Sequence, residues 1–253
     1  MPDTVRSFDG TRIAYTARGA GPTVLLLHGF AADHDLNWGR SGVIDALVAS
    51  GRRVIATDAR GHGESDKPHD VDRYAGDAMV RDAQSVLDHL DVERVDVIGY
   101  SMGAMVAARL VPEEPRSRSL VLGGVGESVV PPQSGGRNPR AIAGALLAED
   151  AASIGNATGR AFREFAEATG ADREALAALS RSTSLRYSVR FDAITVPTLV
   201  IAGTGDTLIR APDALAARLP SARLRMVPGD HLGAPYHREF RDAIVEFLEE
   251  VPR

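Results

Sequence analysis

The chain contains no cysteine, which excludes disulfide bonds, thiolate metal sites and a cysteine nucleophile. Cysteine usage therefore says nothing about the redox compartment. No uninterrupted apolar run approaches the roughly 20 residues that a membrane-spanning helix requires. The first residues, Met1–Arg6, also lack the apolar segment of a secretory signal peptide. We therefore expect a cytoplasmic protein that does not bind membranes.

Patterns for nucleic-acid, metal and nucleotide binding are also missing. The formal net charge is -5, and the arginines are scattered among acidic residues, so no basic face for nucleic acid is expected. No H-E-x-x-H spacing indicates a metal site, and no G-x-G-x-x-G or Walker pattern follows a predicted strand. We expect neither a metal nor a cofactor. The oligomeric state stays open.

Short apolar runs alternate with helical patterns along the 253 residues. An opening hairpin is predicted at Val5–Phe8 and Ile13–Ala17, around Asp9-Gly10. The later runs are apolar on both faces, as in strands of a covered parallel sheet. They are Thr23–Leu27, Val54–Thr57, Val95–Ile98, Leu120–Leu122, Thr198–Ala202 and Arg223–Val227. Helical patterns cover Val43–Ala49, Tyr74–Leu90, Ala211–Leu219 and Arg238–Val251. The fold class is α/β, with a mostly parallel sheet covered by helices on both faces.

One long segment interrupts this alternation. Between about Gly126 and Ile194, a Pro/Gly-rich loop precedes Ala-rich helical stretches, and no strand pattern occurs. We interpret residues 126–194 as an inserted helical lid, and residues 1–125 and 195–253 as the core. Apolar lid residues such as Ile142 and Phe162 are expected mainly to pack against one another, and otherwise to line a pocket.

The pentapeptide Gly99-Tyr100-Ser101-Met102-Gly103 lies between a predicted strand and a predicted helix. G-x-S-x-G in that position is the pattern of a nucleophile elbow. The glycines are needed because the strand end and the first helical turn approach each other too closely for side chains. The turn would expose the Ser101 hydroxyl and direct the free N–H groups of a helix N-terminus toward it.

Other polar residues follow other predicted strands. Asp206 follows the strand ending at Ala202 and a glycine turn, and His231 follows the last strand. His28-Gly29-Phe30 follows Thr23–Leu27. Because the carboxyl ends of parallel strands meet at one edge of a sheet, these residues are expected to lie together.

With these motifs, and with the segment from Asp58 to Ser65, the chain resembles α/β-hydrolase-fold serine hydrolases. The resemblance is to the capped esterases, lactonases, C–C bond hydrolases and perhydrolases, and it covers nearly the whole chain. It implies that Ser101 is the nucleophile, His231 the base and Asp206 the residue that orients it. It also implies an oxyanion hole made by the backbone N–H groups of Phe30 and Met102.

Alternatives remain for two of these roles. His28 and His62 lie in loops near the site and are rivals for the base. Glu127 follows the strand after the elbow, where some family members carry the acid, and Asp230 adjoins His231. For the substrate pocket, the candidates are His28, Trp38 and Phe30, which lie in or near the oxyanion loop.

The resemblance implies hydrolysis of a small or medium carboxylic ester or lactone through an acyl-enzyme on Ser101. The expected partner is thus a small-molecule acyl substrate. One alternative is hydrolysis of a carbon–carbon bond in a diketone-like ring-cleavage product, with perhydrolysis as a side activity. Another is a receptor-like protein of this fold that binds a ligand without turnover.

Overall fold

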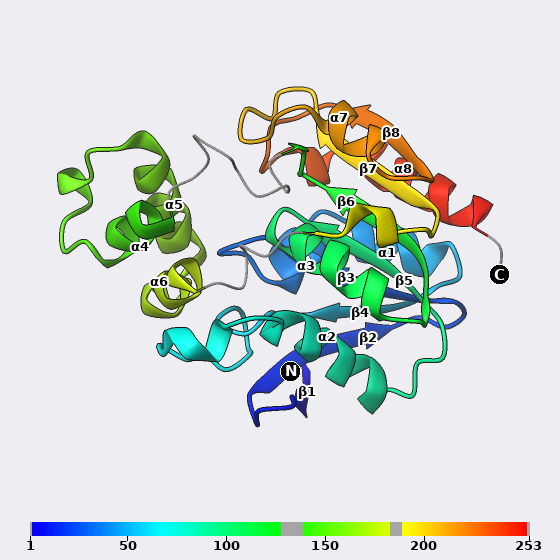
Figure 1. Cartoon of the computed structure of the whole chain (residues 1–253), viewed down its shortest axis with the longest axis horizontal. Coiled ribbons are helices and arrows are strands. Elements are labelled where there is room, and N and C mark those ends of the chain that lie inside the picture. Colours follow the sequence, from blue (N-terminus) through cyan, green and yellow to red (C-terminus); the bar gives the residue numbers. More distant parts are fainter. Residues whose placement is uncertain (1, 128–138, 183–188, 252–253) are drawn as a thin grey trace.

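The computed structural model describes residues 2–127, 139–182 and 189–251. Within them, eight strands form one sheet in the order β1-β2-β4-β3-β5-β6-β7-β8 (Figure 1). The pairs β1–β2 and β2–β4 are antiparallel, and every other pair is parallel. The mostly parallel α/β sheet predicted from the sequence is confirmed.

The predicted strands are all present, with ends shifted by at most a few residues. The strands are β1 Asp3–Arg6, β2 Arg12–Arg18, β3 Thr23–Leu27, β4 Arg53–Thr57, β5 Val95–Tyr100, β6 Ser117–Gly123, β7 Thr198–Gly203 and β8 Ala222–Val227. The α-helices are α1 Val43–Ala49, α2 Ala78–His89, α3 Met102–Leu110, α4 Pro139–Leu147, α5 Ala157–Thr169, α6 Arg173–Arg181, α7 Pro212–Ala217 and α8 Arg238–Glu250.

One helix begins later than the sequence predicts. The pattern from Tyr74 indicates a continuous helix, but α2 starts at Ala78. The preceding residues, Val71–Tyr74, form a separate short helical turn, and Ala75 is extended after it. Gly76 then has a positive φ of 59°, which no helix tolerates.

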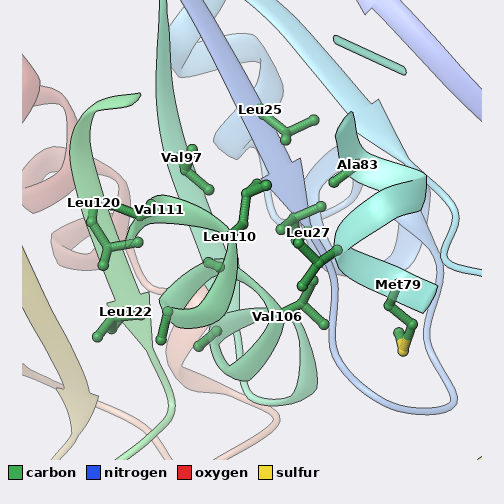
Figure 2. Packing of buried hydrophobic residues seen from close by; sticks show 14 of the residues in the cluster. Leu25, Leu27, Met79, Ala83, Val97, Val106, Leu110, Val111, Leu120 and Leu122 are labelled. Atoms are coloured by element: carbon green, nitrogen blue, oxygen red, sulfur yellow. The ribbon is translucent and has the colours of Figure 1, made fainter. Parts of the chain in front are cut away.

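Helices cover both faces of the sheet, so the inner strands β3 to β7 are buried along almost their whole length. The edge strands β1 and β8 are largely exposed, so the expectation that Arg223–Val227 is buried on both faces is wrong. Alternate residues of one strand enter different cores: Leu25 and Leu27 face α2, α3 and α7, whereas Val24 and Leu26 face α1 and α8. Figure 2 shows the first core, where the side chains of α3 pack against β3, β5 and β6. This packing fixes α3, and therefore its first turn, against the strand ends.

Three helices between β6 and β7 form a group beside the sheet edge (Figure 1). α4, α5 and α6 share a small apolar cluster that contains Ile142, Leu146, Ala166 and Leu176. Ala31, from the loop after β3, is buried in the same cluster. The helices lie in the segment interpreted as a lid; its boundaries at 126 and 194 remain a prediction. Most of the Pro/Gly-rich loop lies outside the described residues.

A buried ion pair ties the β1–β2 turn and α2 to the loop after β4. The Arg60 side chain is fully buried and donates two hydrogen bonds of 2.6 Å to the carboxylate of Asp82 in α2. It also pairs with Asp9 in the turn between β1 and β2, at 3.0 Å. A guanidinium removed from water in this way depends on its carboxylates, because an unpaired buried charge is costly.

We therefore expect Asp82→Ala to lower the free energy of unfolding by about 3–5 kcal/mol, measured by urea denaturation at pH 7. The matched control is Glu250→Ala, which breaks the Arg223–Glu250 pair (2.7 Å), in which both side chains are more than half exposed. That variant should stay within about 0.5 kcal/mol of wild type. Equal losses in the two variants would contradict the structural role of the buried pair.

Candidate active site

Ser101 lies in a strained turn between β5 and α3. Its backbone has φ 51° and ψ -109°, outside the regions that non-glycine residues usually occupy. A side chain at Gly99 would overlap the Gly103 carbonyl and Ala104, and one at Gly103 would overlap the carbonyl groups of Leu27 and His28. Both glycines are therefore required by close backbone contacts, as the sequence predicts. A hydrogen bond from the Ser101 N–H to the Gly123 carbonyl (2.8 Å) holds the turn on β6.

The structure brings Ser101, His231 and Asp206 into one hydrogen-bonded chain. The His231 Nε2 atom lies 2.9 Å from the Ser101 Oγ, and Nδ1 lies 2.7 Å from Asp206 Oδ2. The other oxygen of Asp206 accepts a hydrogen bond from the Leu208 N–H at 2.9 Å. The Asp206 carboxylate is fully buried and the His231 side chain nearly so. In this arrangement Nδ1–H donates to the carboxylate, and Nε2 is free to accept the serine proton.

The rival carboxylates have other positions. Glu127 is exposed, and its backbone N–H donates to the Arg210 carbonyl. The Asp230 carboxylate accepts hydrogen bonds from the backbone N–H groups of Leu232 and Gly233, so it closes its own turn. Neither carboxylate contacts the His231 ring in the part of the chain described, so the geometry singles out Asp206.

The candidate oxyanion donors are the backbone N–H groups of Phe30 and Met102. Met102 is the first residue of α3, where no intrahelical acceptor is available. Across the described ranges, neither N–H donates a hydrogen bond to the protein. Ser101 and Gly29 are adjacent, since a side-chain carbon at Gly29 would lie 3.6 Å from the Ser101 Cβ. Both loops therefore meet at the serine.

The loop that carries Phe30 is held by two side chains. Asn37 Oδ1 accepts a hydrogen bond from the Gly29 N–H at 2.8 Å. His28 Nε2 accepts one from the Ala59 N–H at 2.9 Å, which leaves the proton on Nδ1, 2.7 Å from the Gly29 carbonyl. Because a trans peptide directs its C=O and N–H to opposite sides, fixing the Gly29 carbonyl also fixes the direction of the Phe30 N–H.

An apolar pocket opens at Ser101 and His231. It encloses about 970 Å³, counting its open mouth. Aromatic side chains line it: Phe30, Tyr100, Phe162, Phe165 and Tyr236. The exposed large residues Leu208 and Leu232 also belong to its wall. No sequence motif marks these two leucines or Tyr236, because they belong to separate segments that meet only in the fold.

Comparison with known proteins identifies the family. A family model described as "alpha/beta hydrolase fold" matches residues 22–149, just over half of the chain. The chain belongs to the α/β-hydrolase fold family.

Known proteins resemble this chain in sequence over part of its length or in overall fold. An uncharacterized protein of Mycobacterium tuberculosis (strain H37Rv) is 39% identical over 111 residues, which are 44% of this chain and 31% of that protein. A non-heme haloperoxidase of Rhodococcus erythropolis is 34% identical over 144 residues, 54% of this chain and 48% of that protein. The chain thus matches only a third to a half of the length of these curated relatives. The solved structure of a hydrolase from Pseudomonas aeruginosa PA01 superposes with a TM-score of 0.75, at 27% identity and over 98% of each chain.

The pocket assignments of His28 and Trp38 are wrong. Both side chains are buried, and neither lines the pocket of this α/β-hydrolase-fold protein. Trp38 faces the core, where its ring packs edge-on against Tyr100 at 6.4 Å. His28 lies beneath the oxyanion loop, and burial lowers its pKa. His62 packs against it, and burial lowers the pKa of His62 to about 3. His28 and Trp38 are thus close to the Phe30 loop in sequence, but they pack beneath it or in the core and do not line the pocket.

A buried carboxylate supports the same loop from β4. Asp58 Oδ1 accepts hydrogen bonds from the backbone N–H (2.9 Å) and Nδ1 (2.8 Å) of His34, and its Oδ2 accepts one from the Glu64 N–H (2.8 Å). Burial opposes ionisation of Asp58, but the hydrogen bonds from His34 and Glu64 outweigh it and lower its pKa to about 2. The same contact raises the pKa of His34.

Among the described residues, no group of three or more histidine, cysteine, aspartate and glutamate side chains is arranged to hold a metal ion. None of the helices described is both long and apolar enough to cross a bilayer.

The acid stability of the protein should depend on Asp58. Because the folded-state pKa of about 2 lies below the reference value of 3.8, the charged carboxylate stabilises the fold. This contribution is complete above about pH 5 and is lost as the pH falls toward 2. Between pH 5 and pH 2, wild type should lose about 2 kcal/mol more of its unfolding free energy than Asp58→Asn. Urea denaturation across this range tests the difference; parallel curves for the two proteins would contradict it.

Proposed function

We propose that the protein is a serine hydrolase that cleaves a neutral, apolar carboxylic ester or lactone through an acyl-enzyme on Ser101. The observation that carries this proposal is the hydrogen-bonded chain from Asp206 through His231 to Ser101, at the base of an apolar pocket. The similarity to a hydrolase and to a non-heme haloperoxidase also supports a catalytic role.

In the first half of the cycle, Ser101 Oγ attacks the ester carbonyl carbon while His231 Nε2 takes the hydroxyl proton. The carbonyl oxygen becomes an oxyanion, which the N–H groups of Phe30 and Met102 would stabilise. The imidazolium is stabilised by the Asp206 carboxylate beside Nδ1. When the tetrahedral intermediate collapses, the C–O bond to the alcohol breaks, and His231 returns the proton to the departing oxygen.

In the second half, a water molecule replaces the alcohol. His231 takes one proton from the water as its oxygen attacks the acyl carbon, and the Ser101 ester bond then breaks. The proton passes to Ser101 Oγ and the carboxylic acid leaves. Every proton in this cycle passes between substrate, water and residues of the chain, so the proposed mechanism uses no cofactor.

The apolar lining of the pocket favours a substrate with a neutral, apolar acyl or alcohol group. Phe162 and Phe165 project from α5, and Leu208 and Leu232 come from the loops that carry Asp206 and His231. Each methylene group buried among such side chains contributes up to about 0.8 kcal/mol. A charged group placed there would instead lose its hydration.

The nucleophile is tested with a fluorophosphonate probe and a panel of p-nitrophenyl esters. Wild type should be labelled and turn over many ester molecules, whereas Ser101→Ala should lose labelling and at least roughly 10³-fold in kcat. Ser85→Ala, a serine of α2 outside the pocket, is the matched control and should behave as wild type.

The alternatives give different results in the same experiment. Equal turnover by wild type and Ser101→Ala would refute the assignment of the nucleophile. Labelling of Ser101 without turnover of any ester would favour the receptor-like alternative or a carbon–carbon bond substrate, which ligand-induced thermal shifts and diketone substrates then separate.

The pocket is tested by filling it. Ala161 lies in the α5 wall of the pocket, so Ala161→Trp should lower kcat/KM for p-nitrophenyl hexanoate at least about tenfold, because the added ring occupies the acyl space. Acetate turnover should change less than about threefold. Ala168→Trp, an exposed position of the same helix outside the pocket, is the control and should preserve the preference for hexanoate. Equal losses for both esters would contradict this placement of the acyl group.

A further inference from the structure

The hydroxyl of Tyr100 has no part in the cycle described above, yet it is bonded to the residue that serves as base. Tyr100 is the last residue of β5 and directly precedes Ser101. Its hydroxyl lies 2.6 Å from the backbone carbonyl oxygen of His231. We propose that Tyr100 is a positioning residue for His231, which holds the main chain of the base through this hydrogen bond. The proposal rests on the role of His231 in the proposed function.

The direction of this hydrogen bond is determined by its partners. A carbonyl oxygen only accepts, so the phenol must donate. Tyr100 is 4% exposed, and burial raises its pKa, so the donor proton is retained. Among the residues described, no other donor reaches the His231 carbonyl. The hydroxyl is therefore the partner of a buried carbonyl in the loop that carries the base.

The ring of Tyr100 is packed between three aromatic side chains and the end of β6. Trp38 and Phe240 pack edge-on against it, at 6.4 and 5.8 Å between ring centres, and the imidazole of His231 lies tilted at 5.5 Å. On the β6 side, a Cβ at Gly123 or Gly124 would lie 2.7 Å from a ring atom. Because the ring is packed in this way, the hydroxyl has a fixed position, and its hydrogen bond restrains the loop that carries His231.

This confinement also explains the pair Gly123-Gly124 at the end of β6. Gly124 has a φ of 62°, but Gly123 has no positive φ. What requires glycine at Gly123 is the Tyr100 ring. Two glycines at this point leave room for the Tyr100 ring beside the end of β6.

The hydrogen bond from Tyr100 matters for catalysis because the His231 ring must contact both Ser101 and Asp206 at the same time. Its ring bridges Ser101 Oγ at 2.9 Å and Asp206 Oδ2 at 2.7 Å. Two hydrogen bonds of the loop, from Gly205 N–H to the Gly229 carbonyl and from Ala234 N–H to the Asp230 carbonyl, hold residues on either side of His231. The Tyr100 hydroxyl holds His231 itself. A small displacement of a catalytic group is sufficient to lower turnover strongly.

The test compares Tyr100→Phe with Tyr74→Phe. Tyr74 is also fully buried, and its hydroxyl also donates to a backbone carbonyl, that of Pro68 at 2.7 Å, but it lies outside the candidate site. Each variant therefore loses one buried phenol hydroxyl and keeps the ring. Tyr100→Phe should lower kcat and the rate of fluorophosphonate labelling by roughly 10- to 100-fold, with KM within about twofold. Tyr74→Phe should retain wild-type kinetics.

A readout independent of turnover is the NMR signal of the His231 Nδ1 proton, which lies toward Asp206 and is assigned by its loss in His231→Gln. In Tyr100→Phe this signal should weaken; in Tyr74→Phe it should stay as in wild type. If both variants match wild type in kcat and in the Nδ1 proton signal, the proposal is overturned, whatever their thermal stability. If wild type itself is neither labelled nor active, the proposed function fails, and the NMR comparison alone decides whether Tyr100 positions His231.

Discussion

The candidate site depends on one steric constraint: α3 begins so close to the ends of β3 and β5 that only glycine fits at positions 99 and 103. Packing of α3 against the sheet sets this distance, and the short connection left between strand and helix forces Ser101 to a φ of 51°. The strain is therefore a consequence of the core. The same approach that strains Ser101 leaves the Met102 N–H without an acceptor beside the serine oxygen.

Around the elbow, the buried side chains of His28 and Asp58 have charge states that stabilise the loop carrying Phe30. His28 is kept neutral, since it accepts from one backbone N–H and donates to one carbonyl, while Asp58 is kept ionised by its donors. Their positions are coupled through the loop of residues 28–38, which both of them hold. The Tyr100 hydroxyl adds a neutral hydrogen bond to the loop that carries His231. The loop that carries Phe30 and the residue His231 are thus held by hydrogen bonds between side chains and backbone groups, which are in place before a substrate charge develops.

The sequence was sufficient for the fold and for the group of residues around Ser101, but not for the pocket. Strands such as Thr23–Leu27 were predictable because both faces are buried, and Asp206 and His231 because each follows a strand at the same edge of the sheet. The start of α2 was misjudged because the apolar spacing continues through Gly76, whose backbone breaks the helix. Trp38 was misplaced because its distance from the loop in sequence does not reveal which face of the sheet its ring enters.

Substrate choice cannot follow from the motifs alone, because much of the pocket wall comes from segments that no motif covers, such as α5. Phe162 on α5 packs edge-on against Phe30 at 5.5 Å, and Ala31 lies in the apolar cluster of α4, α5 and α6. Phe30, the proposed oxyanion residue, therefore also contacts the helices between β6 and β7. A change in those helices would alter the pocket and the loop that carries Phe30 through the same contact. Substitutions at Phe162 should consequently affect substrate preference and turnover together, whereas those at Ala161, which lies outside that cluster, should affect preference alone.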